Sequence, residues 1–502
     1  MSESLRLSRR TLLASAGAGA LTASVPGRAA AAGPDEAPSG PSEAREVDVA
    51  IVGAGLTGLT AARQLKQAGR SVHVVEADDR VGGRVWTVDA ADGTPVNWGA
   101  TFVGPQQTRI LGLAKELGVG TYKTFNTGKN VQFFNGNRKT YQGTIPAVDL
   151  GSLLELNTLM SRLNGHASSL DPAAPWAEPR AKEWDAQTFY TWIRTNARST
   201  QTHKLLDLAC LSLFSVESQE IPLLHVLFYI RSAGSLQVLL NTGNAAQEQQ
   251  FDGGSQRIPE LMAAQLGDDA VTLSSPVRRV VTDGDRTIVH GDGVTVSAKR
   301  VIVAVPPPMI PRISFEPGLS ALKDQLCQRS PMGSVGKAVA VYDRPFWRAK
   351  GLTGQATSDT GPVKITFDIS PGSGTPGVMM GFVDGQDARE FGVTSLADRR
   401  AAVLEQFTTW FGPEAASPKE YLDVHWDSLE FHRGCPVAVP QPGAITGYKG
   451  ALSAPEGALH FACTETATRW SGYMDGAVQA GEVVAAQVGA ALGALLSLAA
   501  AL

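Results

Sequence analysis

The feature that most constrains this chain is the glycine-rich stretch GAGLTG at residues 53–58, which directly follows a short apolar run. That run, VDVAIV at residues 47–52, contains β-branched residues and predicts a strand. Apolar residues then recur at helical spacing until Gly69, which is typical of a helix end. A lone G-x-G-x-x-G is weak evidence, but between a strand and a helix it predicts a βαβ dinucleotide-binding unit rather than a chance turn.

Each glycine of this motif has a separate physical task. Gly53 allows the tight turn, Gly55 lets a pyrophosphate approach the backbone, and Gly58 lets the helix pack closely on the strand. The helix N-terminus adds unpaired N–H donors and a partial positive charge. We therefore expect a phosphate-bearing cofactor at this turn.

The next strand, residues 71–75, ends at Glu76, an acid 21 residues after Gly55. A carboxylate at this position accepts hydrogen bonds from both ribose hydroxyls and repels a 2′-phosphate, so NADP is not expected. Immediately afterwards, Arg80-Val81-Gly82-Gly83-Arg84 combines two glycines with two arginines, which can neutralise a diphosphate. An NAD dehydrogenase does not need this second clamp, so the segment favours FAD over a solvated basic turn.

The N-terminus predicts an export signal. Paired arginines in SRRTLL, residues 8–13, precede an uncharged apolar stretch, and small residues at 29–32 offer cleavage sites. This twin-arginine pattern predicts a signal peptide at 1–32 and a mobile linker at 33–45. The stretch is too short to favour a membrane-spanning helix. We expect export through the twin-arginine pathway to the periplasm, the cell surface or the extracellular space.

The C-terminus is also apolar from residue 483 to residue 502. Alanine and glycine dominate it, and it has neither flanking basic residues nor an aromatic belt. We favour a helix packed on the sheet, followed by an apolar tail at 492–502, over a membrane anchor.

Charge and side-chain chemistry exclude other classes of protein. Lys plus Arg total 44 and Asp plus Glu total 48, a net charge of -4 that argues against nucleic-acid binding. Four cysteines in 502 residues cannot form a disulfide scaffold. No metal site is expected, because metal-ligand spacing is absent from His203, His225, His290, His425 and His432.

Three further segments resemble the flavin-containing amine oxidase family, in its monoamine oxidase branch. NWGATFVG at 97–104 is similar to the family stretch after the arginine clamp, and PMGSVGK at 331–337, with PFWR at 345–348, is similar to its lysine segment. FACTETATRWSGYMDGA at 461–477 is very close to its C-terminal flavin motif. With these segments, the resemblance extends over nearly all of the chain from residue 46 to about residue 490.

The resemblance implies an α/β fold in which a Rossmann-like FAD-binding domain is interleaved with a substrate domain of mixed sheet and helices. A buried-strand signal at 300–305, ended by three prolines, agrees with this division. The implied FAD-binding pieces are 46–121, 252–326 and 429–491, and the implied substrate-binding pieces are 122–251 and 327–428.

The resemblance also implies which residues contact FAD. Val277 falls where the family's strand meets the cofactor through backbone groups, and a helix beginning near Gly472 would aim its donors at the flavin. The full implied set is Gly53, Gly55, Gly58, Glu76, Arg80, Gly82, Gly83, Arg84, Gly99, Ala100, Val277, Trp426, Cys435, Glu465, Gly472, Tyr473 and Met474.

Two residues carry the implied catalysis. In the family, the lysine matched by Lys337 holds a water near flavin N5 and assists the reaction with oxygen, since an ammonium there stabilises developing negative charge. Tyr473 matches one wall of an aromatic cage that orients a neutral amine. The alternatives are a lysine whose stem lies along the surface and a tyrosine that only packs.

Cys435 matches the cysteine that bonds the flavin 8α-methyl in some family members, with Trp426 nine residues upstream. Its alternative role is that of a small buried apolar residue. Pro436 stands where monoamine oxidases carry the second cage tyrosine, and Cys463 stands where the family usually has glycine. The first departure puts a preference for aryl monoamines in doubt.

The implied activity is that of an exported FAD-dependent amine oxidase, which uses a small amine and molecular oxygen and releases imine or aldehyde, ammonia and hydrogen peroxide. The alternatives are a polyamine, putrescine or L-amino-acid oxidase of the same fold, a non-catalytic flavoprotein carrier and an NAD-dependent dehydrogenase. A homodimer is left open. The implied cavity residues, mostly apolar and each also consistent with plain core, are Phe102, Leu239, Leu240, Gln247 and Leu352.

Overall fold

The computed structural model describes the backbone of residues 44–499 and the side chains as far as residue 493. The predicted signal peptide, residues 33–43 of the predicted linker and the last three residues of the predicted tail lie outside the described residues. The first strand begins at Arg45, one residue before the predicted start of the FAD-binding domain.

The first part of the fold is an eight-stranded mixed sheet. Its centre is parallel, with β1 between β12 and β2, while β10 and β11 form an antiparallel extension. The second half of β1, residues 49–52, is a continuous apolar run because both of its faces are buried in this sheet. In spatial order the strands are β13 (Ser314–Glu316), β10 (Val277–Asp283), β11 (Arg286–Gly291), β12 (Val294–Val303), β1 (Arg45–Val52), β2 (Val72–Val75) and β9 (Val271–Thr272), with β19 (Leu459–Phe461) beside the end of β12.

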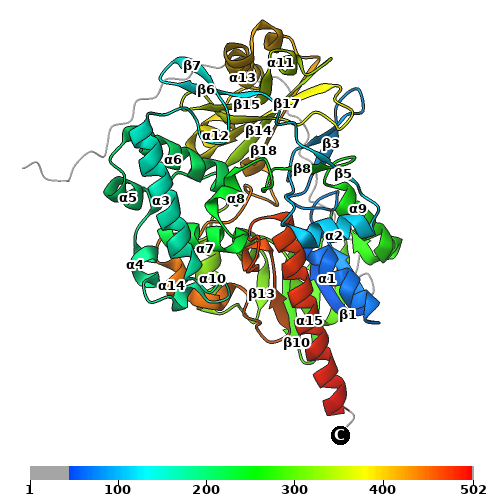
Figure 1. Cartoon of the computed structure of the whole chain (residues 1–502). Helices are drawn as coiled ribbons and strands as arrows, with labels where there is room; N and C mark the ends of the chain where they lie inside the picture. The colour runs from blue at the N-terminus through cyan, green and yellow to red at the C-terminus, as the bar shows by residue number, and fades with distance from the viewer. Residues whose placement is uncertain (1–43, 500–502) are drawn as a thin grey trace, which may run out of the picture. The chain divides into compact units, whose positions relative to one another are not determined.

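Helices cover this sheet, and two of them come from opposite ends of the described chain. α1 (Leu56–Gln67) lies beside α15 (Met474–Ala499), as the blue and red helices of Figure 1 show. Their backbones approach closely at Gly481, where an added Cβ would lie 2.6 Å from the Thr57 carbonyl oxygen. Val484, Val488 and Leu492 of α15 are buried there. α2 (Thr108–Glu116), α9 (Arg257–Leu266) and α10 (Ala321–Gln328) complete this part.

The second part is a seven-stranded sheet, antiparallel except where β15 pairs with β6. α13 (Leu396–Phe411) packs a row of buried apolar side chains against it, and α11 (Phe346–Ala349) and α12 (Gly385–Phe391) flank it. In spatial order the strands are β18 (Glu420–His425), β14 (Val335–Tyr342), β17 (Gly377–Asp384), β16 (Val363–Asp368), β15 (Leu352–Ser358), β6 (Lys129–Phe134) and β7 (Asn137–Tyr141).

A helical layer adjoins the second sheet and has its own apolar core, which includes Phe214, Tyr229 and Trp470. α7 is buried along almost its whole length, so it runs through the middle of this layer. The helices are α3 (Leu150–Ser168), α4 (Ala181–Ala186), α5 (Phe189–Asn196), α6 (Thr200–Phe214), α7 (Leu223–Ala233), α8 (Leu236–Leu240) and α14 (Ala444–Tyr448) (Figure 1).

The predicted fold class is confirmed. The strands of the first sheet come from residues 45–75, 271–316 and 459–461, and those of the second come from 129–141, 335–384 and 420–425. The two parts therefore alternate along the chain, as the sequence implies, while the boundaries of each piece stay predictions. Among the described residues, no helix combines the length and the apolar character needed to cross a bilayer.

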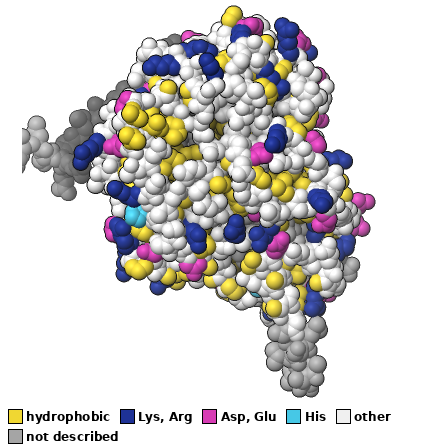
Figure 2. All heavy atoms as spheres, viewed as in Figure 1, with side chains coloured by type: hydrophobic (Ala, Val, Ile, Leu, Met, Phe, Trp, Pro, Cys, Tyr) yellow, Lys and Arg dark blue, Asp and Glu magenta, His cyan; other side chains and the backbone are white. Residues whose placement is uncertain are grey.

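Acidic and basic side chains are interspersed over the face in Figure 2. Apolar side chains gather on this face over the first turns of α3, where Leu150 is 71% exposed and Leu154 is 59% exposed. Within the described residues, no group of three or more His, Cys, Asp or Glu is arranged to hold a metal ion.

Candidate active site

The glycine-rich turn has the conformation that its sequence predicts. Gly53 has a positive φ of 103°, and an added Cβ would lie 2.9 Å from the Ala304 carbonyl oxygen. A Cβ on Gly58 would lie 2.0 Å from the Gly53 carbonyl oxygen, so only glycine lets α1 pack on this turn. Gly55 is the N-cap of α1 and offers no side-chain cap, so the first N–H groups of the helix remain available to a ligand.

Glu76 lies at the end of β2 with its carboxylate buried against this turn. One oxygen accepts the Ala54 N–H at 2.5 Å, and the other accepts the Asp78 N–H at 2.9 Å. Burial raises the pKa of Glu76, an effect that these two donors oppose. Because a carboxylate has about four acceptor positions, two remain for ribose hydroxyls.

The two arginines of the predicted diphosphate clamp have different surroundings. Arg84 lines the cavity and forms a bidentate ion pair with Glu465, at 2.6 and 3.1 Å. Arg80 does not line the cavity: its guanidinium lies 4.2 Å from the Trp86 ring centre and donates to the Gly83 carbonyl at 3.0 Å. The structure therefore does not place Arg80 and Glu465 on the cavity wall: Arg80 supports the loop and Glu465 supports Arg84.

One cavity of about 1130 Å³ connects the glycine-rich turn with the helical layer. That volume exceeds the few hundred Å³ that one small amine requires, so the cavity has room for a cofactor as well. The predicted cofactor residues that line it are Gly53, Gly55, Glu76, Gly82, Gly83, Arg84, Gly99, Ala100, Val277, Trp426, Cys435, Gly472, Tyr473 and Met474.

These residues fit a flavin adenine dinucleotide. Gly82 and Gly99 form a backbone cradle without side chains, since an added Cβ would lie 2.3 Å from the Val85 carbonyl oxygen and 2.2 Å from the Arg84 carbonyl oxygen, respectively. The indole N–H of Trp98 is buried on the cavity wall and has no protein partner. A buried donor without a partner is costly, so it indicates a ligand acceptor at that point.

Lys337 extends from β14 into the cavity and is 5% exposed. Its ammonium donates to Thr101 Oγ1 at 2.7 Å, to the Asn97 carbonyl at 3.2 Å and to the Gly99 carbonyl. Burial lowers the pKa of Lys337 to about 7, against weaker opposing effects of nearby Cys435 and Asp384. With its pKa of about 7, the side chain is held inside the cavity and carries its charge below about pH 7, so it is not a lysine whose stem lies along the surface.

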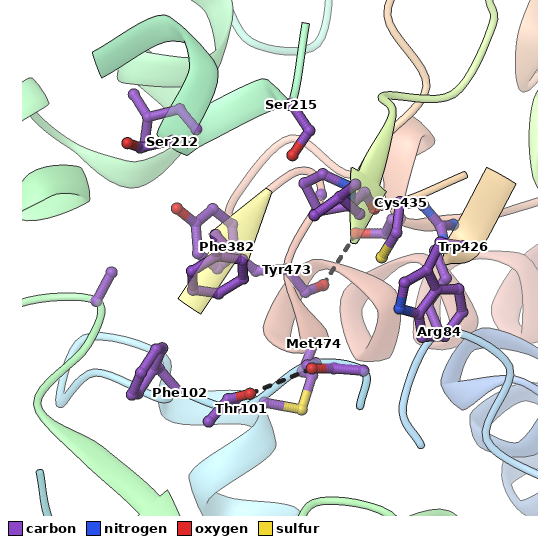
Figure 3. Close-up of a pocket in the computed structure, with 18 of the residues that line it drawn as sticks. Arg84, Thr101, Phe102, Ser212, Ser215, Phe382, Trp426, Cys435, Tyr473 and Met474 are labelled. Atoms are coloured by element: carbon purple, nitrogen blue, oxygen red, sulfur yellow. Dashed lines mark hydrogen bonds between the residues drawn. The ribbon is translucent and has the colours of Figure 1, made fainter. Parts of the chain in front are cut away.

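Tyr473 lines the same cavity beside two other aromatic side chains. Its ring centre lies 5.7 Å from that of Tyr229 and 5.0 Å from that of Trp470. Figure 3 shows Phe102 and Phe382 on one side of Tyr473, with Arg84, Trp426 and Cys435 on the other. Burial raises the pKa of the Tyr473 hydroxyl, which therefore stays protonated at neutral pH.

Cys435 and Trp426 both lie on the cavity wall and pack in one apolar cluster. The Trp426 indole N–H donates to the Trp98 carbonyl at 3.0 Å, which fixes the ring beside the cradle. Burial raises the pKa of the Cys435 thiol to about 11. Pro436 and Cys463 also line the cavity, and burial raises the pKa of the Cys463 thiol.

Four of the five predicted substrate-cavity residues line this cavity: Phe102, Leu239, Leu240 and Gln247. Leu352 does not. It begins β15 and packs in the core under α13, because its side chain belongs to the buried cluster of Trp347 and Phe407. The structure therefore places Leu352 in the core and not on the cavity wall.

Sequence reasoning missed part of the cavity wall. Asp384, Ser215 and Tyr229 all line it. Tyr229 lies within helix α7, which is mostly apolar and almost entirely buried, so no pattern separates it from the core. Asp384 follows an apolar strand and precedes a helix, a position normally occupied by a helix-capping aspartate. The sequence around Tyr229 and Asp384 therefore did not indicate that either residue lines the cavity.

The comparisons with known proteins agree with this geometry. The family model described as flavin containing amine oxidoreductase matches residues 56–489. The chain belongs to this flavin-containing amine oxidoreductase family, which confirms the predicted resemblance and the class of enzyme.

Individual relatives come from several organisms. The Mycobacterium tuberculosis H37Rv protein named "Putative flavin-containing monoamine oxidase AofH" is 42% identical over 453 residues, which cover 89% of this chain and 97% of that protein. Amine oxidase [flavin-containing] B of Sus scrofa is 34% identical over 89% of this chain and 86% of its own length.

Solved structures are similar over the same extent. Wild-type putrescine oxidase bound to putrescine is 33% identical, with a TM-score of 0.86 over 89% of this chain and 100% of that one. Cyclohexylamine oxidase from Brevibacterium oxydans IH-35A is 31% identical, with a TM-score of 0.85 over 89% of this chain and 99% of that one.

Proposed function

We propose that this chain is an exported amine oxidase that deaminates a small primary amine oxidatively and releases hydrogen peroxide. The observation that carries the proposal is the fixed ammonium of Lys337 in the same cavity as the Tyr473 and Tyr229 rings. A flavoprotein that only carries electrons needs neither group. When bound, FAD supplies the acceptor for the hydride from the amine α-carbon and is reoxidised by molecular oxygen.

The residues proposed to hold FAD are the glycines of the cradle, the first turn of α1, Glu76 and Trp98. Gly53, Gly55 and the helix N-terminus supply space and N–H donors for the pyrophosphate. Glu76 accepts from the ribose hydroxyls, and Trp98 donates its free indole N–H. Cys435 is proposed to hold the flavin through its 8α-methyl. A thioether there would require loss of the thiol S–H and of one 8α C–H bond, with the two electrons taken up by the flavin and then by oxygen.

The protein contributes position, exclusion of water and charge to the reaction. Tyr473, Tyr229 and Phe382 provide ring faces that orient an uncharged amine nitrogen. The ammonium of Lys337, held by Thr101 and two carbonyls, stabilises the negative charge that develops when oxygen is reduced. Apolar side chains of the helical layer exclude water, which strengthens these interactions.

A diamine oxidase is the second candidate, and Asp384 supports it. A diamine presents a second ammonium, which needs a carboxylate in the cavity, and Asp384 is a buried carboxylate on its wall. An L-amino acid would need an arginine free to pair with its carboxylate. Arg84, which lines the cavity, is already paired with Glu465.

A peroxide assay with an amine panel tests the proposal. Purified protein is given phenylethylamine, tyramine, putrescine and an L-amino acid, and peroxide and aldehyde are measured. The proposal expects peroxide and aldehyde in equal amounts with at least one amine and none with the L-amino acid. A flavin-loaded protein that releases no peroxide with any amine contradicts it.

A further inference from the structure

Asp384 is a buried carboxylate on the cavity wall, and one of its oxygens lacks a partner. The residue is 2% exposed at the end of β17. Ser215 Oγ donates to its Oδ1 at 2.7 Å, whereas Oδ2 makes no hydrogen bond although it is shielded from solvent. Because an unpaired buried carboxylate oxygen is costly, a hydrogen-bond donor that reached this carboxylate from the cavity would be stabilised there.

Helix capping does not explain why a buried carboxylate stands at position 384. It is the N-cap residue of α12, yet its side chain accepts no hydrogen bond from that helix. Glu217 caps the helix instead, because its Oε1 accepts the Gln386 N–H at 3.1 Å. The capping role is thus supplied by another residue, and the Asp384 carboxylate is left to the cavity.

The sheet register places Asp384 close to the proposed reaction site. β17 pairs with β14 so that Phe382 is opposite Lys337 and Asp384 is opposite Val335. Side chains two residues apart share one face of a sheet, so Asp384 shares the face of Phe382. All four residues line the cavity.

Ser215 connects this carboxylate with the Cys435-Pro436 segment. An added Cβ on Gly333 would lie 3.2 Å from Ser215 Cβ and 2.9 Å from the Cys435 carbonyl oxygen. Ser215 and Cys435 therefore flank the same glycine, and Figure 3 shows both side chains at one end of the cavity.

The charged groups near Asp384 nearly balance. Lys364 of β16 pairs with Asp387 of α12 at 2.9 Å, Glu217 follows α6, and Lys337 of β14 is held by its carbonyl partners. Burial raises the pKa of Asp384 to about 7, Asp387 and Glu217 act in the same direction, and Ser215 and Lys364 oppose it. A cation in the cavity would hold this carboxyl in its ionised form.

We propose that Asp384, supported by Ser215, is an anionic subsite that receives a protonated amino group of the substrate. The ammonium binds to the ionised Asp384 carboxylate. Where the bound nitrogen is the one that reacts, its proton then passes to that carboxylate and leaves a neutral amine and a neutral carboxylic acid. A monoamine presents its reacting nitrogen, and a diamine presents its second nitrogen. This inference rests on the proposed function, because it concerns the amine that the cavity admits.

Binding of amines that cannot be oxidised tests the subsite independently of turnover. The probes are 2-phenylpropan-2-amine and 2,5-dimethylhexane-2,5-diamine, neither of which has an α C–H bond. Calorimetry compares the flavin-loaded wild type with Asp384→Asn, which keeps the shape and removes the charge. We expect the variant to bind about 10- to 100-fold more weakly, as for a lost hydrogen bond to a charged group.

The two probes separate the two nitrogen sources. Weaker binding of both probes assigns the subsite to the reacting nitrogen, and weaker binding of the diamine alone assigns it to the second nitrogen. Unchanged binding of both overturns the proposal. Asp387→Asn, which removes a carboxylate outside the cavity wall, is the matched control. Because Asp387 raises the pKa of Asp384, this control is measured well above pH 7, where Asp384 is ionised in either protein, and it should leave both affinities unchanged. If the wild type oxidises no amine, the proposed function fails, while these affinities still test the subsite.

Ser215→Ala provides a second test that keeps the carboxylate. The Ser215 hydrogen bond lowers the pKa of Asp384, so its loss raises that pKa. Probe binding strengthens as pH rises through the ionisation of Asp384, and the midpoint should move to higher pH in this variant. A midpoint that stays at the wild-type pH contradicts the role of Ser215 in the subsite. Flavin content and melting temperature, measured for every variant, verify the fold.

Discussion

Replacing Lys337 with methionine removes one ammonium from the cavity and keeps the length of the side chain. In the wild type that ammonium is fixed by Thr101 Oγ1 at 2.7 Å and by the Asn97 and Gly99 carbonyls, so it needs no reorganisation when negative charge develops. Loss of one such preorganised group costs about 10²- to 10³-fold in rate. We expect the reaction of the reduced enzyme with oxygen to slow by about 100-fold, with flavin content unchanged.

The pKa of Lys337 gives this prediction a pH signature. With a folded-state pKa of about 7, the ammonium predominates below pH 7 and is lost above it. The oxygen reaction of the wild type should therefore slow as pH rises through about 7, and that dependence should be absent from Lys337→Met. Because the folded-state pKa lies below the value of about 10.4 in the unfolded chain, this lysine destabilises the fold most at low pH. Its contribution to stability should improve between pH 7 and 10.

Stopped-flow mixing of photoreduced enzyme with oxygenated buffer measures this rate. Lys323→Met is the matched control, because Lys323 is equally buried, donates to the carbonyls of Ala451, Leu452 and Ala454, and lies outside the cavity wall. It should lower the melting temperature and leave the oxygen reaction within about twofold of the wild type. A wild-type rate for Lys337→Met, or an equal loss for Lys323→Met, refutes the reasoning.

Three further predictions concern attachment, cofactor loading and export. Acid-precipitated wild type should keep its yellow colour and Cys435→Ala should release FAD to the supernatant; free flavin from the wild type would exclude a thioether. Gly58→Ala places a Cβ 2.0 Å from the Gly53 carbonyl oxygen and should lower stability by about 1–3 kcal/mol and abolish flavin loading, whereas Gly489→Ala on α15, with open space around it, should do neither. Changing both Arg9 and Arg10 to lysine should retain the protein in the cytoplasm, as fractionation would measure, and undiminished export would contradict the twin-arginine assignment.

The parts predicted from sequence are those in which backbone geometry limits the choice of residue. Gly53 and Gly58 are recognisable because any Cβ would collide with backbone atoms at the turn. Tyr473 and Lys337 were placed by family motifs, and the structure brings both to one cavity.

The parts that sequence could not predict depend on tertiary contacts. Whether an apolar residue lines a cavity or packs in a core depends on the elements that meet it. The sequence therefore did not reveal that Leu352 packs in the core under α13. The sequence likewise did not reveal that Arg80 lies off the cavity wall. Its partners, the Trp86 ring and the Gly83 carbonyl, become its neighbours only in the folded loop. Asp384 resembled a helix cap until Glu217, 167 residues earlier, was seen to perform that task.

The most direct test of the central claim is an anaerobic titration of the purified protein with an amine, monitored by visible absorbance. The account predicts a yellow protein whose flavin bands bleach on addition of an amine and return when oxygen is admitted. A folded protein that is colourless and takes up no added FAD, or a yellow one whose bands no amine bleaches, would contradict it.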